Sequence, residues 1–220
     1  MLPGELWVCT LGEAAMVAVA LRDDSGKPVL VTCQRPIILT MPRGGGTVTM
    51  HVVRHAPGGR MTVFEADFQV HHHRMVDLTL LRPLGEGPAQ VFEVGTMSSR
   101  VVGEPITIPG FSSPGANPVL WESRIFERQI HQVQLDYSLY SRMEVLTLHM
   151  DSDQCLPGSP VLHDGHLVGI YAEHRSNANF QSLAKLEFRT PITFQSLDFA
   201  LCLSVRHVRE FLADGSLLPA

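Results

Sequence analysis

Short runs of β-forming residues, separated by turns rich in glycine and proline, extend along nearly the whole chain. The run Met16–Leu21 ends before the turn Asp23–Gly26, and the run Thr47–Val53 ends shortly before Ala56–Gly59. Tight turns join neighbouring strands in antiparallel order, and regular short strands with this spacing are typical of barrels and sandwiches. We therefore expect an all-β fold.

The runs fall into two sets, which are separated by the proline- and glycine-rich stretch Pro83–Pro88. We predict two antiparallel β-barrels, residues 1–90 and 91–220, that together form one unit. The other runs predicted to be strands are Pro28–Thr32, Pro36–Thr40 and Met61–Val70 in the first set, and Val91–Val94, Glu104–Ile108, Pro118–Glu127, Val133–Tyr137, Glu144–Met150, His166–Ala172 and Phe199–Leu203 in the second.

A helix is predicted only near the end of the sequence. Ser204 can cap the first turn, and Asp214–Gly215 can end the helix. Apolar side chains recur at helical spacing between these signals, at Val205, Val208, Phe211 and Leu212. This helix should pack its apolar face on the second barrel.

The composition is that of a globular protein without an electrostatic attraction for nucleic acid. Of the 220 residues, 45% are hydrophobic and 18% are charged, which is enough to bury one large core or two smaller ones. The net charge is -5, and no run of lysine or arginine occurs. A partner with a phosphate backbone is therefore not expected.

Several features predict an intracellular, cytoplasmic protein with no membrane partner and no cofactor. Apolar stretches such as Ala14–Leu21 are too short to span a bilayer, and Met1–Glu5 contains no basic residue of the kind that opens a secretory signal. Cysteines that lie far apart, without a C-x-x-C pair, favour free thiols in a reducing compartment. They are Cys9, Cys33, Cys155 and Cys202.

Five segments of the chain match short sequence motifs. Ile37–Arg43 is similar to a V-L-T-A-A-H strand end, and Val76–Pro83 resembles a D-[LI]-A-L-L-[RK] strand. Gly103–Phe111 is similar to G-x-x-V-x-x-x-G-[FY], and Pro157–Ile170 resembles S-G-S-P-V…G-x-V-x-G-I. Phe199–Leu212 is similar to an F-A-I strand followed by a helix. Each motif is weak alone, but all five occur in the order found in the trypsin-like serine proteases. The chain therefore resembles this family, and the spacing of the motifs resembles that of its compact HtrA-type (high-temperature-requirement) members.

The resemblance implies that the catalytic residues of the family are largely missing. Amide hydrolysis in this fold needs a hydroxyl nucleophile, a histidine base, a carboxylate that orients the histidine, and two backbone N–H donors for the oxyanion. The chain keeps the carboxylate, Asp77, but the nucleophile position is Pro157 and the base position is Arg43. Proline has neither a hydroxyl nor an N–H, arginine stays protonated, and Cys155 replaces the glycine of the other oxyanion donor. We therefore predict an inactive homologue, a pseudoprotease that binds proteins or supports a complex.

An active peptidase of the same fold is the alternative. His51 lies in an H-V-V sequence that often contains the base, so a shifted alignment would restore it, and Cys155 could supply a thiolate nucleophile. Two observations oppose this alternative. The strand around His51 is a good hairpin partner for Met61–Val70. Leu156 and Pro157 separate Cys155 from the following glycine, whereas the viral cysteine proteases of this fold have the cysteine directly before the glycine, so a small buried thiol is the simpler interpretation. Ser159 is interpreted as a structural hydroxyl of the turn.

A run of histidines suggests a third possibility, a metal-binding β-domain. His71 and His73 share a face if the run is a strand, and His51 and His55 lie nearby in sequence. A stable site needs three or four ligands, and the sequence identifies only two on one face. We therefore interpret the histidines as a solvated strand face and predict no metal site.

Two features could form a peptide-binding surface. The strand that contains Gly169, Tyr171, Ala172 and Glu173 matches the edge that pairs with an extended substrate in the family, and strand addition needs no catalytic residue. Asp151 precedes the nucleophile position by six residues, where trypsin-type enzymes keep the carboxylate that selects Arg or Lys. An ordinary loop carboxylate is the alternative interpretation of Asp151. The expected partner is a protein, bound through an extended segment.

Overall fold

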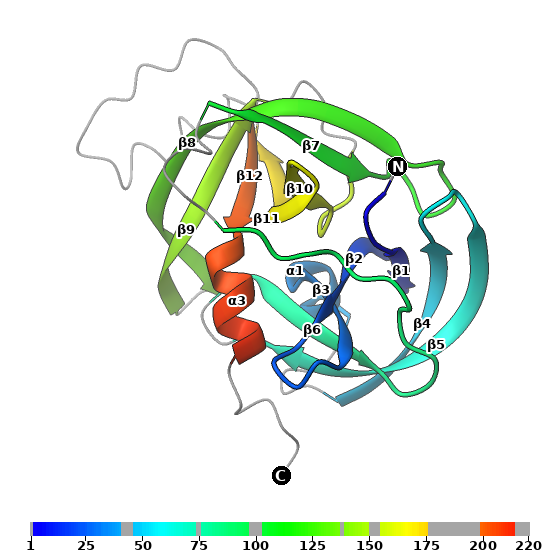
Figure 1. Ribbon diagram of the computed structural model, residues 1–220. Coiled ribbons are helices and arrows are strands. Elements are labelled where there is room, and N and C mark those ends of the chain that lie inside the picture. Colours follow the sequence, from blue (N-terminus) through cyan, green and yellow to red (C-terminus); the bar gives the residue numbers. More distant parts are fainter. Residues whose placement is uncertain are drawn as a thin grey trace.

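The computed structural model describes residues 2–40, 46–73, 76–96, 103–136, 139–149, 155–175 and 199–213. Two β-barrels lie side by side, and a helix lies at their junction (Figure 1). Each barrel contains six antiparallel strands in a closed ring. This arrangement confirms the predicted fold class.

The first barrel closes through pairing of its first and fourth strands, in which Leu6 faces His55. Around the ring, the strand order is β1-β2-β3-β6-β5-β4. Its interior is filled by large side chains such as Trp7, Met50 and Phe68, which are buried. Its strands are β1 (Leu6–Leu11), β2 (Ala14–Arg22), β3 (Pro28–Cys33), β4 (Gly46–His55), β5 (Met61–His72) and β6 (Leu78–Pro83).

The second barrel has the order β10-β11-β12-β9-β8-β7 and closes where Leu162 pairs with Thr107. Ile108, Val161 and Tyr171 are among the buried residues of its interior. Its strands are β7 (Pro105–Gly110), β8 (Val119–Asp136), β9 (Leu139–His149), β10 (Pro160–His163), β11 (His166–Arg175) and β12 (Phe199–Ser204).

Two short segments predicted as strands have other conformations. Pro36–Thr40 contains most of the helix α1 (Arg35–Ile38) and the turn after it, because proline fits the first turn of a helix and the Ile37 side chain is buried against the first barrel. Val91–Val94 is an extended linker that makes an isolated bridge, between Val94 and Leu167. Apolar residues in such short runs do not by themselves distinguish a strand from a helical turn.

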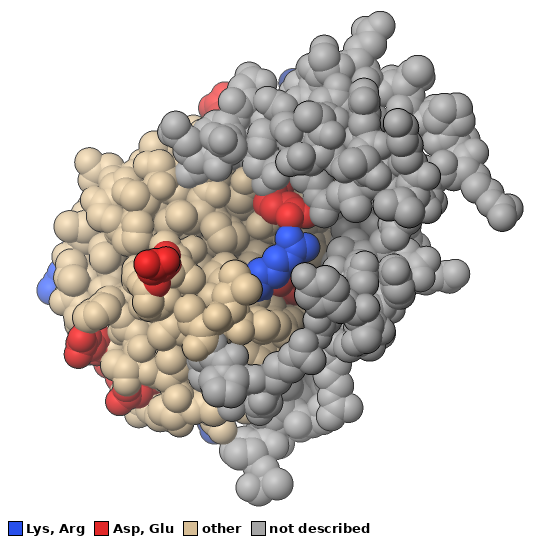
Figure 2. All heavy atoms as spheres, turned by 180° about the vertical axis from the view of Figure 1, so that it is seen from behind, with Lys and Arg blue, Asp and Glu red and all other residues tan. Residues whose placement is uncertain are grey.

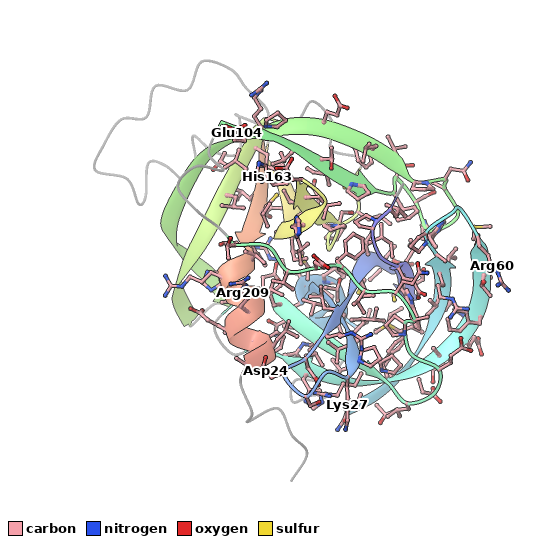
Figure 3. All side chains as sticks on the ribbon, in the orientation of Figure 1. Asp24, Lys27, Arg60, Glu104, His163 and Arg209 are labelled. Atoms are coloured by element: carbon pink, nitrogen blue, oxygen red, sulfur yellow. The ribbon has the colours of Figure 1, made fainter. Side chains whose placement is uncertain are left out.

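The predicted terminal helix is present as α3 (Val205–Ala213). Its first turn is capped by the Ser204 hydroxyl, which accepts the N–H of Arg206 at 3.3 Å. Figure 3 shows Arg209 on α3 beside the linker, and its guanidinium donates to the Val94 carbonyl oxygen at 3.1 Å. Within the described parts of the chain, no helix is long and apolar enough to cross a membrane.

A single apolar cluster joins the two barrels and α3. Val17 and Leu78 reach it from the first barrel, Leu162 and Ile170 from the second, and Phe211 from the helix. Burial of apolar area is the main favourable term in such a contact. The interface between the barrels is therefore a third core, in addition to the two barrel interiors.

The backbones of the two barrels are in contact at Gly158, in the loop before β10. The Val17 N–H donates to the Pro157 carbonyl oxygen at 2.8 Å, and the Gly158 N–H donates to the Tyr171 carbonyl oxygen at 2.8 Å. Gly158 has φ 92°, a conformation that favours glycine. A Cβ at this position would overlap the Val17 carbonyl oxygen and lie 2.5 Å from Thr32 Oγ1. Only glycine lets this loop reach β2.

We expect Gly158→Ala to lower the free energy of unfolding by about 3 kcal/mol, through left-handed backbone strain and overpacking against β2. Urea denaturation measures this loss. Gly85→Ala is the matched control, because no atom lies within 4 Å of its Cβ position and its φ is not positive. Equal stability of the two variants would contradict the close approach.

Candidate functional site

Asp77 is a buried carboxylate held by the backbone of the first barrel. It precedes β6, and its Oδ1 accepts the N–H groups of Gln34 and Arg35 at 3.0 and 2.9 Å, where β3 leads into α1. Burial raises the pKa of Asp77 from 3.8 to about 6, although the Arg35 guanidinium and the two N–H donors oppose this shift. At neutral pH the group is mainly an ionised carboxylate that needs a cation nearby.

Arg35 supplies that cation and links the two barrels. Its Nε lies 3.3 Å from Asp77 Oδ2, and its Nη1 donates to Glu173 Oε2 at 2.6 Å. Partial burial works against the charge of Arg35, but Glu173 and Asp77 outweigh it and raise the pKa of Arg35 above its ordinary value. The guanidinium therefore stays protonated and donates only.

Arg35 is not among the residues predicted from the sequence. The predicted base position is Arg43, which lies outside the described residues. The described side chain that contacts the Asp77 carboxylate is Arg35, at the end of the run Leu30–Arg35. That run reads L-V-T-C-Q-R and fits the V-L-T-A-A-H pattern when the threonines are aligned. A threonine stands three residues before both Arg35 and Arg43, so the pattern offers Arg35 as a second candidate but does not choose between the two.

The loop before β10 contains the residues predicted at the nucleophile and oxyanion positions. The Pro157 carbonyl oxygen is bonded to Val17, and proline contributes neither a hydroxyl nor an N–H. Burial raises the pKa of the Cys155 thiol to about 12, although a bond to Ser159 opposes this. The thiol donates to Ser159 Oγ at 3.3 Å, and the Ser159 hydroxyl donates to the Leu156 carbonyl oxygen at 2.9 Å. The Cys155 thiol and the Ser159 hydroxyl therefore form their hydrogen bonds within the loop itself.

The other candidate base lies apart from these groups. His51 is mostly exposed on β4, where its Nδ1 lies 3.2 Å from Glu65 Oε1 on the neighbouring strand. The described contacts of the Asp77 carboxylate are with Gln34 and Arg35 instead. The structure does not bring His51 and Asp77 together.

Two histidines of the run, His72 and His73, form hydrogen bonds with neighbouring groups, whereas the buried Nε2 of His71 has no hydrogen-bond partner among the described residues. His72 Nδ1 lies 2.7 Å from Thr79 Oγ1, and His73 Nδ1 accepts the Val76 N–H at 3.0 Å. The His73 ring also packs edge-on against Phe211. Among the described residues, no group of three or more histidine, cysteine, aspartate or glutamate side chains is placed to hold a metal ion.

The predicted peptide-binding strand divides into an enclosed part and an open part. Gly169 pairs with both β10 and β12, and the Tyr171 side chain is buried in the second barrel. The Tyr171 backbone N–H donates a hydrogen bond to the Ser159 carbonyl oxygen. Beyond a register shift after Tyr171, β11 pairs with β12 alone among the described strands. Ala172 and Glu173 therefore lie on the open part. Asp151 lies outside the described residues.

The four cysteines are free and buried.

On the face shown in Figure 2, most of the described surface is neither basic nor acidic, and basic atoms touch acidic atoms near its centre. No continuous basic patch is present on the described part of this face.

Comparison with models of known families finds no match, and comparison with curated sequences finds none either. Solved structures are similar to the chain over nearly its whole length. The protease Rv3671c from M. tuberculosis, in its active form, has a TM-score of 0.64 at 16% identity, over 99% of this chain and 83% of that one. The protease domain of MamO from Magnetospirillum magneticum has a TM-score of 0.60 at 15% identity, over 97% and 98%.

The fold is that of the trypsin-like serine proteases. A further similar structure is a variant of the HtrA-type protease AlgW with a tripeptide, with a TM-score of 0.57 at 14% identity, over 94% of this chain and 58% of that one. At such identities the similarity concerns the trypsin-like fold alone. The chemistry has to be argued from the residues of this chain.

We expect Arg35→Gln to destabilise the protein by about 2 kcal/mol at pH 8 and by less at pH 5, because it leaves a buried carboxylate without its cation, although Arg35 is only half buried. The folded pKa of Asp77 lies above its unfolded value. Its contribution to stability is therefore present below pH 4 and is lost as the pH rises through about 6. Without Arg35 the folded pKa rises further, and the loss extends to higher pH.

Urea denaturation of both proteins at pH 5 and pH 8 measures this difference. Arg60→Gln is the control, since Figure 3 shows Arg60 at the β4–β5 turn, where it is exposed. A pH-independent effect of Arg35→Gln would show that Asp77 does not depend on the guanidinium.

Proposed function

We propose that this chain is a catalytically inactive homologue of the trypsin-like serine proteases that binds an extended segment of a protein partner. The contact between Arg35 and Asp77 carries the proposal. In the mechanism of this fold, a buried aspartate orients a histidine that removes the proton of the nucleophile. Arg35 stands beside the aspartate, and a guanidinium that remains protonated has no lone pair to accept that proton.

The nucleophile loop supports the same conclusion. Pro157 has no attacking atom, and it removes one backbone donor from the place where an oxyanion would be stabilised. Loss of a single such donor typically costs a factor of about 100 to 1,000 in rate. Combined with the missing base and nucleophile, this leaves no route to amide hydrolysis.

The alternative of an active peptidase is not favoured by the geometry. A nucleophilic cysteine needs a lowered pKa and access to substrate, whereas burial raises the pKa of Cys155 to about 12. His51 is paired with Glu65 on an exposed strand. Neither residue has the contacts that a catalytic pair requires.

Binding remains possible without the catalytic residues. The open part of β11, at Ala172 and Glu173, offers backbone groups to an added strand, and strand addition obtains its affinity from main-chain hydrogen bonds. The AlgW variant of similar fold is a structure with a tripeptide. The binding of an extended segment along β11 requires no metal and no cofactor.

The proposal predicts no turnover of fluorogenic peptide libraries, no labelling by a fluorophosphonate, and no alkylation of Cys155 by iodoacetamide until the protein is unfolded. An active protease of the same fold, assayed in parallel, shows that the substrates and probes work. Turnover or native-state labelling that disappears in Cys155→Ser would overturn the assignment. Turnover that disappears in His51→Gln would establish the shifted base.

A further inference from the structure

His55 is a buried histidine that lies where the two barrels meet. It is the last residue of β4, and 6% of its surface is exposed. The centre of its ring lies 4.4 Å from that of Phe111, which follows β7 in the second barrel (Figure 1). We propose that His55 is a proton-sensitive contact through which acid loosens the joint between the barrels. The joint is the His55–Phe111 contact together with the hydrogen bond from Val17 to Pro157.

The packing of the chain gives no reason for a histidine at this position. Its Nε2 atom is buried and has no hydrogen-bond partner in the part of the chain that the structure describes. Buried polar atoms are nearly always hydrogen-bonded, and one without a partner costs stability. A leucine would fill a similar volume without this cost. The property that distinguishes histidine from leucine here is its ability to take up a proton near neutral pH.

The groups that contact the ring are apolar. Leu6 of β1 and Met61 of β5 lie opposite His55 in the two strand pairings, and Phe111 contacts it from the second barrel. Burial lowers the pKa of His55, and no charge of a described residue contributes to this shift. The histidine is therefore neutral when the joint is closed.

The titratable groups on the surrounding elements have partners of their own or are exposed. On β1, β4, β5 and the turn after β4, they are Glu5, His51, Arg54, Arg60 and Glu65. In the second barrel, the Cys155 thiol lies beside Gly110 and donates to Ser159 Oγ. Among these described groups, no carboxylate is placed to pair with a protonated His55.

A proton on His55 puts an unpaired charge into this apolar contact. The cost of burying such a charge exceeds the attraction between an imidazolium and the face of an aromatic ring. The ring reaches water only if Phe111 and the end of β4 separate. Since the pKa of His55 in the closed joint lies below its usual value of 6.5, the open joint binds the proton more tightly. The joint is therefore most stable above about pH 6.5 and loses stability as the pH falls below this value.

Phe111 connects His55 to the loop that docks one barrel on the other. Its carbonyl oxygen accepts the Leu156 N–H at 2.8 Å, and the carbonyl oxygen of the next residue, Pro157, accepts the Val17 N–H at 2.8 Å. Val17 belongs to β2 of the first barrel. A movement of Phe111 away from His55 therefore acts on the hydrogen bond that joins the barrels.

Acid also titrates other groups of the first barrel. His71 Nε2 is buried without a described partner, and burial, followed by the charge of Arg82, lowers the pKa of His71. Asp77 acts in the opposite direction, because burial raises its pKa. These groups remain in a variant that lacks only His55, so a comparison of variants isolates the effect of His55.

The test compares amide hydrogen exchange in the wild type and in His55→Leu at pH 7 and pH 5, measured by NMR and corrected for the intrinsic pH dependence of exchange. The reporters are the Val17 and Leu156 amides, which form the two hydrogen bonds described above. In the wild type we expect their protection factors to fall about tenfold between pH 7 and pH 5, because the histidine has an ordinary pKa in the open joint and a lower one in the closed joint. In His55→Leu the fall should be less than about twofold.

His51→Leu is the matched control, because it removes a histidine of the same strand whose side chain is 74% exposed. It should show the same fall as the wild type. At pH 7 we expect His55→Leu to be at least as stable as the wild type in urea denaturation, since it removes an unpartnered buried nitrogen. His55→Phe is the second variant in case His55→Leu folds poorly, because it cannot be protonated and keeps an aromatic ring against Phe111.

Two results would overturn the proposal. One is an equal fall in protection in the wild type and in the His55 variants. The other is an equal fall at every protected amide of the wild type, including those of the β2–β3 and β7–β8 pairings, because this pattern describes unfolding of the whole chain. A fall confined to the amides of the joint, and absent without His55, supports it. Neither result depends on whether β11 binds a segment, so the proposed function is tested separately.

Discussion

The structure depends on the contact between the loop before β10 and strand β2. There a backbone without a side chain, at Gly158, lies against the Val17 carbonyl oxygen, and the hydrogen bond from the Val17 N–H to the Pro157 carbonyl oxygen connects the barrels. The apolar cluster that includes residues of both barrels and α3 surrounds this contact. A side chain at Gly158 would separate the two halves of that cluster and also move Arg35 away from Glu173, because these residues belong to different barrels.

Under the proposed function, this dependence would explain how a catalytic framework persists in a chain without the catalytic groups. Asp77 also has a structural role, since its carboxylate accepts the N–H groups at the start of α1. The loop at Pro157 likewise docks one barrel onto the other through its carbonyl oxygen. Replacement of the base and the nucleophile changes side chains that protrude from the framework, while Asp77 and Gly158 belong to the framework itself. A relative that loses the reaction therefore still has to keep these two.

The fold class could be predicted because each strand is short and each turn is marked by glycine or proline, and because Ser204 and its apolar spacing identify α3. The position of Arg35 could not be predicted in the same way. The segments Leu30–Arg35 and Ile37–Arg43 both fit the pattern that precedes a catalytic histidine, and only the contact with Asp77 distinguishes them. Tyr171 was predicted to bind peptide from its strand alone. Its burial follows from the register of β11 against β10 and β12, and this register could not be predicted from the sequence.

The location of α3 has a consequence for how the protein is made. Residues 205–213 follow every described strand in the sequence, yet Val205, Val208 and Phe211 complete the cluster between the barrels. During synthesis the first barrel can close as soon as β6 has emerged. The face of this barrel that contacts the second barrel is not fully buried until α3, the last described element, has been synthesised. A nascent chain of this kind exposes apolar surface until α3 has been added, and such surface makes a folding intermediate prone to aggregation.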